Sequence, residues 1–460
     1  MSKSRISEAE AERRLFESMP VARAILTLAV PTVIGQIITI IYNMADTFFI
    51  GRIGDPNQVA AATLAMPLFT LMTAISNLFG IGGASLISRK LGLGDRKKAS
   101  NVCAFSVWTG GLAALIYGII ILLVRPSLLP ALGADLATYE FTSSYLFWTI
   151  GIGAVPTVLN PLLSHLIRSE GHSREASFGV ALGGILNILL DPLFIYVFRL
   201  QITGAAIATF LSNLLAAMYF AIFIFVKRRM SVITLSPKFY SVSERIPVEV
   251  MSVGLPSFLI SMTATVSNMV LNHIIAGYSN TAIAGMGIAK KVNMLAFAVA
   301  QGITQGTLPL IGYNYTSGDR KRMISVIRTL FVFCLSVAIV IAFVLYFGAD
   351  SVTRLFIDDE ETVHYGRMFL HIICCACPMS SITFFSLTVF QATGKKLAPI
   401  ILSVLRKGTI DLPFMVLFNT LIGINGVAWA TPVAETVSML ASAALVLPYM
   451  KKLAKAQENV

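Results

Sequence analysis

Long apolar stretches separated by short polar segments make up most of the chain. A membrane-spanning helix needs about 20 mostly apolar residues. Twelve stretches reach that length, and they lie near residues 23–50, 58–88, 100–124, 136–168, 174–199, 203–226, 247–278, 281–312, 322–348, 362–392, 396–421 and 424–450. The pattern therefore predicts an all-α polytopic membrane protein with twelve transmembrane helices.

The second half of the chain repeats short motifs of the first half at a nearly constant distance. GDRK occurs at Gly94–Lys97 and again at Gly318–Lys321, and Pro31 in LAVP matches Pro256 in VGLP. The segment ITGAAIAT returns in the second half as INGVAWAT. Matches at one spacing predict two six-helix halves. Because six is even, both halves enter the membrane from the same side and should be related by a pseudo-two-fold axis along the membrane normal.

Two pseudo-symmetric lobes follow from this repeat. Such lobes place a substrate cavity between them and suit alternating access by rocking. The expected segments are a cytoplasmic N-terminal segment at 1–22, an N-lobe with helices 1–6 at 23–228, a cytoplasmic linker at 229–245, a C-lobe with helices 7–12 at 246–452 and a cytoplasmic tail at 453–460.

Basic residues gather in one set of the connections between the apolar stretches. They cluster in segments 89–98, 227–238 and 320–322, whereas the alternate connections carry isolated arginines or the acidic run Asp358–Glu361. The positive-inside rule then places the basic connections and both termini in the cytoplasm. We expect a multi-pass protein of the cell inner (cytoplasmic) membrane.

Composition supports a protein of the lipid bilayer. The chain is 56% hydrophobic and 13% charged, whereas soluble domains carry about 25% charged residues. The basic connections explain the net charge of +12, so no nucleic-acid partner is expected. We also expect the protein to be a monomer. The five cysteines include a CCACP cluster with one CxxC, Cys374 to Cys377, but no second CxxC to pair with it, so no metal or redox cofactor is expected.

Acidic and polar residues occur at one depth of the N-lobe. A carboxylate at membrane depth is costly and indicates a functional site, and Asp191 lies in such an apolar stretch, one helical turn after Asn187. At 1.5 Å per residue, Asp46 of the first stretch and Thr209 of the sixth lie at about the same depth as Asp191, roughly 8–12 Å inside the outer boundary. Tyr42 lies one turn below Asp46.

Two carboxylates at one depth require compensation. No lysine or arginine of the first half reaches that level from its own span, so the carboxylates cannot both stay charged and unpaired. Either one is protonated or a cation lies between them, and oxygen ligands suit a hard cation or a proton. The sequence predicts a cation- or proton-coupling site at Asp46, Asn187, Asp191, Thr209 and Tyr42, with the first four as ligands if the ion is Na+. The alternative is that the carboxylates only hydrogen-bond helix neighbours.

The second half carries charges of both signs within its spans. Lys290, Arg406, Asp411 and Glu435 are balanced in charge, which favours an internal salt-bridge network that holds the lobe rigid. The alternative is a second proton or substrate site around Asp411 and Glu435.

Residues of the drug cavity are harder to identify from the pattern. The chain carries 29 Phe and 18 Met, and a lining of Met and aromatic side chains suits flat, lipophilic cations. Most of these residues must face lipid or neighbouring helices. Gln36 and Met66 are expected at the cavity only because they face the same half of the membrane.

Three motifs carry a family resemblance. They are YNMADTFFIG at Tyr42–Gly51, NILLDPLFIY at Asn187–Tyr196 and GAAIAT at Gly204–Thr209. Together they resemble the multidrug and toxic compound extrusion (MATE) family, most closely its prokaryotic DinF-like and MepA-like branches. The resemblance implies a twelve-helix, two-lobed antiporter that exports cationic or amphiphilic organic compounds against H+ or Na+. It also implies that the acidic residue of helix 1 and the Asn and Asp of helix 5 form the cation-binding network.

The expected function is therefore secondary active multidrug export with no cofactor beyond the coupling ion, H+ or Na+. The chain has no P-loop, HExxH or GxSxG motif, so neither ATP-driven transport nor an enzyme is favoured. One alternative is a lipid-linked oligosaccharide or polysaccharide flippase of the same superfamily, which typically has fourteen spans and a basic cavity. Another is a membrane-embedded enzyme, which would need converging catalytic groups.

Overall fold

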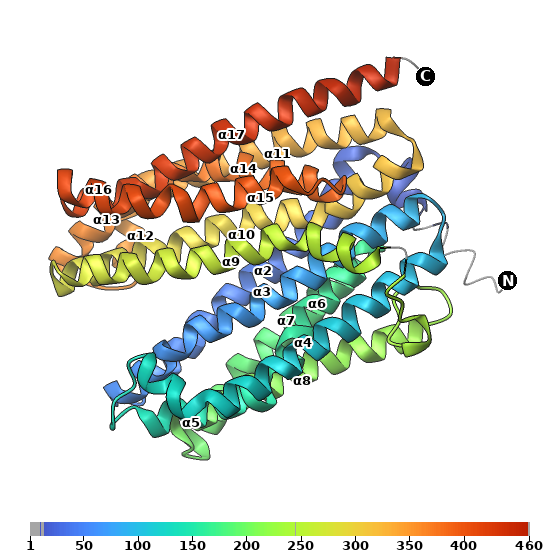
Figure 1. Ribbon diagram of the computed structural model, residues 1–460. Helices are drawn as coiled ribbons and strands as arrows, with labels where there is room; N and C mark the ends of the chain where they lie inside the picture. Colours follow the sequence, from blue (N-terminus) through green and yellow to red (C-terminus); the bar gives the residue numbers. More distant parts are fainter. Residues whose placement is uncertain (1–9, 11–12, 244, 459–460) are drawn as a thin grey trace. The chain divides into compact units, whose positions relative to one another are not determined.

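Helices make up all the regular elements of the computed structural model, which describes residues 10, 13–243 and 245–458 (Figure 1). In chain order they are η1 (Arg14–Ser18), α2 (Val21–Gly51), α3 (Pro56–Gly92), α4 (Arg96–Ala131), α5 (Tyr139–Leu146), η2 (Phe147–Ile152), α6 (Ala154–Ser169), α7 (Ser173–Pro192), η3 (Leu193–Val197), α8 (Gln201–Lys227), η4 (Pro237–Phe239), α9 (Ile246–Ala276), α10 (Asn280–Ser317), α11 (Arg320–Phe347), α12 (Ala349–Arg354), α13 (Glu360–Cys374), α14 (Ala376–Ala392), α15 (Leu397–Val404), η5 (Leu405–Thr409), α16 (Asp411–Ile422) and α17 (Ile424–Glu458). Each of the twelve predicted stretches corresponds to one helix or one broken helix, so the predicted fold class is confirmed. The predicted segments 1–22 and 453–460 lie partly outside the described residues.

Within the described part of the chain, nine helices are long and apolar enough to cross a membrane, or up to eleven if each bent pair is one span. The pair formed by α5–η2 and α6 bends by 51°, and the pair α13 and α14 bends by 41°. In both pairs a proline, Pro156 or Pro378, is the third residue after the break. Proline lacks the backbone N–H of a helix interior and is tolerated in a first turn, so the chain restarts its helix there.

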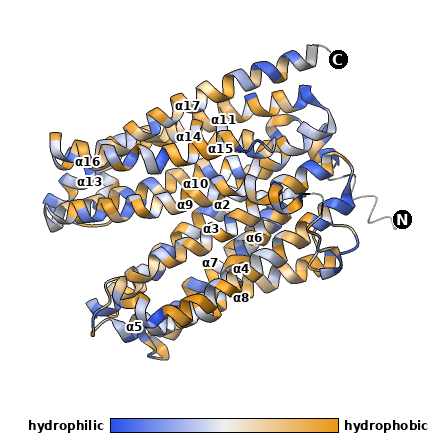
Figure 2. Cartoon of the chain, in the orientation of Figure 1, coloured by the Kyte–Doolittle hydropathy of each residue, from blue (hydrophilic) through white to orange (hydrophobic). Residues whose placement is uncertain are grey.

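The remaining predicted span is divided into α15, η5 and α16. Arg406, Lys407 and Asp411 interrupt its apolar sequence at the π-helical turn η5. π-helical turns are frequent at functional sites. Figure 2 shows that apolar residues cover the middle of the long helices, while hydrophilic residues concentrate towards the helix ends and connecting loops.

The chain divides into two compact units. Unit 1 comprises Met1–Ser18 and Ile34–Phe258, and unit 2 comprises Met19–Val33 and Leu259–Val460. The divisions fall inside α2 and α9, each of which contributes its first part to one unit and its remainder to the other. Both helices contain an internal proline close to the division, Pro31 in α2 and Pro256 in α9. The predicted linker at 229–245 lies within unit 1.

Glycines let the first part of α9 approach α3 closely in unit 1. A Cβ atom added to Gly254 of α9 would overlap the backbone of Leu78, and one added to Gly82 of α3 would overlap the backbone carbonyl of Val250. Unit 2 has the corresponding contact, because a Cβ at Gly306 of α10 would lie close to the first part of α2. Small residues that allow close helix approach are a common device in membranes.

Gly254→Ala is expected to destabilise unit 1 by about 1–3 kcal/mol, because overpacking forces backbone shifts. The matched control is Gly287→Ala in α10, where no atom lies within 4 Å of the added Cβ. Alanine favours helix over glycine, so the control should melt at the wild-type temperature or slightly above it. Melting temperatures of the purified variants in one detergent provide the measurement. Equal melting temperatures for both variants would contradict the close approach of α3 and α9.

Residues 230–240 of the linker run along α4. Ser100 donates a hydrogen bond to the carbonyl of Val232 at 2.9 Å, and the Trp108 ring nitrogen donates to Leu235 at 3.1 Å. The buried carboxylate of Glu170 accepts from the backbone N–H of Val232 at 2.6 Å. These bonds satisfy linker backbone groups that have no helix of their own.

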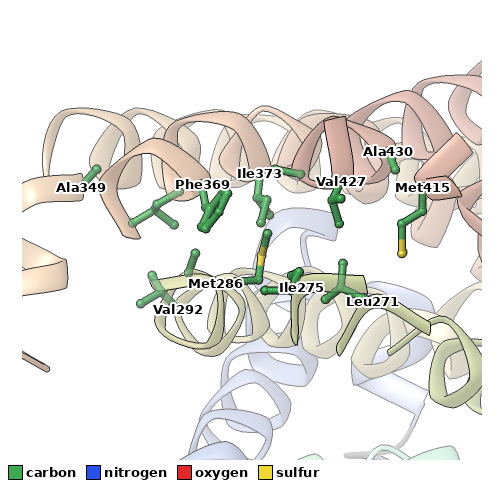
Figure 3. Packing of buried hydrophobic residues seen from close by; sticks show 13 residues of the cluster. Leu271, Ile275, Met286, Val292, Ala349, Phe369, Ile373, Met415, Val427 and Ala430 are labelled. Carbon is green, nitrogen blue, oxygen red and sulfur yellow. The ribbon is translucent and has the colours of Figure 1, made fainter. Parts of the chain in front are cut away.

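An apolar cluster forms a core within unit 2. Its buried side chains come from α9, α10, α12, α13, α16 and α17. Figure 3 shows Phe369 and Ile373 pointing towards the side of the cluster that holds Met286. Leu271 of α9 and Met415 of α16 belong to the same cluster. The cluster therefore fixes α9 and α16 in place. These two helices carry the polar residues Ser267 and Asp411, each one turn before Leu271 or Met415.

Candidate functional site

Consecutive glycines in α7 bring three helices of unit 1 together. A Cβ at Gly183 would lie 3.1 Å from Ala216 of α8, and one at Gly184 would lie 2.9 Å from the ring of Tyr42 in α2. Since side chains one turn apart share a helix face, Asn187 and Asp191 follow these glycines towards the same neighbours. The sequence of α7 thus positions its polar residues between α2 and α8.

Asn187 joins α7 to α8 at the predicted site. Its side-chain amide donates to the Asp191 carboxylate at 3.4 Å and to the Thr209 hydroxyl at 3.3 Å. Asp191 is 0% exposed. The depth estimate from the sequence placed Asp191 and Thr209 at one level, and the structure brings both within reach of Asn187.

Asp46 and Tyr42 lie on α2 beside this group. Both side chains are half-buried, and the two carboxyl groups, Asp46 and Asp191, lie close enough to interact electrostatically. The Tyr196 hydroxyl of η3 donates to the backbone carbonyl of Phe49 at 2.7 Å. This bond ties the end of the α7–η3 span to α2, so the five predicted site residues form one group in unit 1.

Three oxygen atoms of this group lack partners among the residues that the structure describes. They are Asp46 Oδ1, Asn187 Oδ1 and Asp191 Oδ2, each buried. Within the same described residues, no lysine or arginine forms an ion pair with Asp46 or Asp191. A buried acceptor without a donor is costly, and converging oxygens suit a hard cation or a proton. The arrangement can therefore bind one small cation or take up a proton.

Tyr145 is a further member that the sequence reasoning missed. It lies on α5, is 4% exposed, and is within electrostatic range of Asp46, Asp191 and Tyr42. Its ring packs against Phe69 at 6.0 Å between centroids. The helical rise applied to the fourth apolar stretch, which starts near residue 136, could have placed Tyr145 near the same depth.

Gln36 and Met66 do not join this group. Gln36 is half-buried on α2, and Met66 on α3 is 60% exposed. Among the described residues, no hydrogen bond links either side chain to the carboxylates. Their expected place at a drug cavity stays a prediction.

The charges of the second half form two separate groups within unit 2. In the first group, the Arg406 guanidinium pairs with Glu435 at 2.7 Å, and their side chains are 4% and 1% exposed. The same guanidinium lies over the ring of Phe384 at 4.2 Å and over that of Phe297 at 5.4 Å. A buried ion pair beside aromatic rings fits the internal salt bridge that the sequence favours, and its structural role stays a prediction.

The second group surrounds Asp411. The Lys407 ammonium lies 3.3 Å from Asp411 Oδ2, and the Ser267 hydroxyl donates to the same oxygen at 2.5 Å. Lys290 instead donates to the Asn268 side chain at 2.8 Å. Lys290 also lies within electrostatic range of Asp411, so it stays near this group although its hydrogen bond goes to a neutral amide oxygen.

Comparisons with known proteins agree over nearly the whole chain. The sequence model of the MatE family matches residues 31–193 and, a second time, residues 256–417. Multidrug export protein MepA of Staphylococcus saprophyticus is 32% identical over 435 residues, which cover 94% of this chain and 94% of that protein. MepA of Staphylococcus aureus strain NCTC 8325 is 31% identical over 442 residues, or 95% of each chain.

Solved structures share the fold. The crystal structure of MATE in complex with MaL6 has a TM-score of 0.90 at 24% identity and covers 96% of this chain and 99% of that chain. An outward-facing structure of a multidrug resistance MATE family transporter has a TM-score of 0.87 at 24% identity, with 96% and 98% covered. The two matches of one family model to this chain also support the internal repeat.

Proposed function

The chain belongs to the MatE family, and we propose that it is a secondary active multidrug exporter that exchanges cationic or amphiphilic organic compounds for H+ or Na+. The family resemblance of the sequence motifs is thereby confirmed. Relatives that span nearly the whole chain are named multidrug export proteins, which supports the same activity here. The chain is a multi-pass membrane transporter. We place both its termini in the cytoplasm, because the basic connections lie on the same side of the membrane as the termini and basic connections are cytoplasmic.

The oxygen group of Asp46, Asn187 and Asp191 is the observation that carries the coupling part of this proposal. Two neighbouring carboxylates repel each other, and a bound cation or a proton on one of them removes the repulsion. The same negative charges attract a cationic drug. The coupling ion and the drug therefore oppose each other's binding, and this coupling is reciprocal.

Pro192 weakens the turn of α7 at which we expect the helix to change conformation when the ion binds. It follows Asp191 directly and removes the backbone donor that would bond the carbonyl of Ile188. Entry of the ion from outside changes the charge of Asp191 next to this weakened turn, reshapes the helix and releases the drug. Loss of the ion to the cytoplasm restores the affinity for the next drug molecule.

Ethidium accumulation in cells that lack their own efflux pumps tests the export activity. Cells that express the chain are expected to accumulate less ethidium than cells with an empty vector, and a protonophore or removal of sodium should abolish the difference. Equal accumulation in both cell lines, with the protein present in the membrane, would contradict export. The alternative of a membrane-embedded enzyme predicts that equality.

A further inference from the structure

The second half of the chain contains a counterpart of the oxygen group. Asp191 is followed by Pro192, and Asp411 is followed after one residue by Pro413. Four residues before Asp191 lies Asn187, and four residues before Asp411 lies Lys407. In each unit the side chain one turn earlier contacts the carboxylate, at 3.4 Å from the Asn187 amide and at 3.3 Å from the Lys407 ammonium.

The α9 side of this counterpart follows the repeat more closely than Asp411 does, since Asp411 lies 220 residues after Asp191 and Pro256 lies 225 residues after Pro31. The spacing that relates Pro31 to Pro256 relates Tyr42 to Ser267, and the Ser267 hydroxyl donates to Asp411 at 2.5 Å. The same spacing relates Asp46 to Leu271, which is 2% exposed in the apolar core of unit 2 (Figure 3). The second copy therefore holds one carboxylate where the first holds two.

The two copies differ most in charge. The first holds two carboxylates, Asp46 and Asp191, and no ion pair with a lysine or arginine of the described chain. In the second, Asp411 alone faces Lys407 at 3.3 Å and lies within electrostatic range of Lys290. With Lys407 charged, the second copy is already neutral around Asp411, before any charge on Lys290 is counted. It has no electrostatic reason to bind a further cation.

We propose that the Asp411 group is a second copy of the cation site whose cation the chain itself supplies. The Lys407 ammonium takes the place that H+ or Na+ takes beside Asp191, and Lys290 is a second amine within electrostatic range of the same carboxylate. This inference rests on the proposed coupling role of the first copy. Its consequence is that one cation is exchanged in each transport cycle, through unit 1 only.

Because the Lys407 ammonium is covalently attached to the chain, the second copy does not exchange its cation for an ion from solution. Tethering gives the ammonium a high effective concentration at the carboxylate that no solvent ion matches. Removing one partner of a buried ion pair leaves an uncompensated charge. Without Lys407, Asp411 Oδ2 is available to bind a cation from solution. The buried Asp411 Oδ1, which has no partner in the described part of the chain, is a second available ligand atom. Without its lysines, the copy becomes an oxygen group like the first.

The test counts the cations taken up by purified protein. Lys407→Asn restores the residue type of the first copy, and Lys290→Gln removes the lysine that could replace Lys407. Proton uptake on a shift from alkaline to mildly acidic pH, and binding of radioactive sodium, are measured on folded, monodisperse samples. The double variant is expected to take up one cation more than Lys290→Gln alone, and adding Asp411→Asn should remove that extra cation.

Control variants separate this inference from the proposed function. Lys407→Arg keeps a tethered cation and should leave the cation count unchanged, as should Asp411→Asn alone in the wild-type background. The inference is overturned if the folded double variant shows the same count as Lys290→Gln alone, if its extra cation survives Asp411→Asn, or if Asp411→Asn alone lowers the wild-type count. Retention of the wild-type count by Asp191→Asn would refute the proposed coupling site instead.

Discussion

Asp191→Asn is expected to abolish cation-coupled export while leaving the fold intact. Asparagine has nearly the same shape and can still accept from the Asn187 amide, whose bond to Asp191 is 3.4 Å long. It cannot bind a proton or supply the negative charge that holds Na+. Between linked sites, one ligand typically changes the affinity for the other by about 5–150-fold. In Asp191→Asn, the drug affinity should no longer change when the coupling ion is added.

Transport and drug binding of the purified variant, with and without the ion, provide the measurement. Asp358→Asn is the matched control, because the same chemical change falls on an exposed carboxylate outside the spans, and it should behave like the wild type. Asp46→Asn should resemble Asp191→Asn. Ion-dependent export that survives Asp191→Asn would remove this residue from the coupling mechanism.

Glu435→Gln should cause the largest loss of stability among single substitutions of charged residues. Its carboxylate pairs with Arg406 at 2.7 Å, with both side chains almost fully buried. Glutamine leaves the guanidinium without a counter-charge, and breaking a buried pair in this way typically costs about 3–5 kcal/mol. The aromatic rings of Phe384 and Phe297 stabilise the cation too weakly to offset the loss.

Melting temperatures in detergent measure this effect against a matched exposed pair. Glu360 pairs with Arg354 at 2.9 Å but its side chain is 79% exposed, and exposed pairs contribute only about 0–1 kcal/mol. Glu360→Gln should therefore leave the melting temperature nearly unchanged. Equal effects of Glu435→Gln and Glu360→Gln would contradict a structural role of the buried pair.

The helices could be predicted from the sequence because the bilayer imposes their length and requires each backbone group to bond within its own segment. The breaks were harder to foresee. The turn at η5 follows from the charges Arg406 and Lys407 inside an apolar stretch, and the bend before α6 follows from Pro156. Apolar length alone reports neither feature.

The sequence predicts how deep in the membrane each residue of the candidate site lies. It does not predict how each helix is turned about its own axis. Counting residues from the helix ends placed Asp46, Asp191 and Thr209 at one level. Which face each helix presents depends on packing, here on the close approach at Gly184. For the same reason the sequence did not identify Tyr145 as a member.

The partners of the second-half charges could not be read from the pattern either. Lys290 and Asp411 come from helices far apart in sequence, and only the packed structure assigns Lys290 to Asn268 and Lys407 to Asp411. The drug cavity has no comparable signal, because Met and aromatic residues are spread over all faces of the spans. Gln36 and Met66 were therefore predicted from position alone.

Transport by purified protein in liposomes tests the central claim most directly. Proton and sodium gradients are imposed separately, and the movement of a fluorescent organic cation is followed against its own gradient. We predict that one of the two ion gradients drives the drug uphill in the opposite direction, and that Asp191→Asn removes this movement. Drug movement at the same rate with either gradient, with none, and in Asp191→Asn would contradict coupled antiport through unit 1.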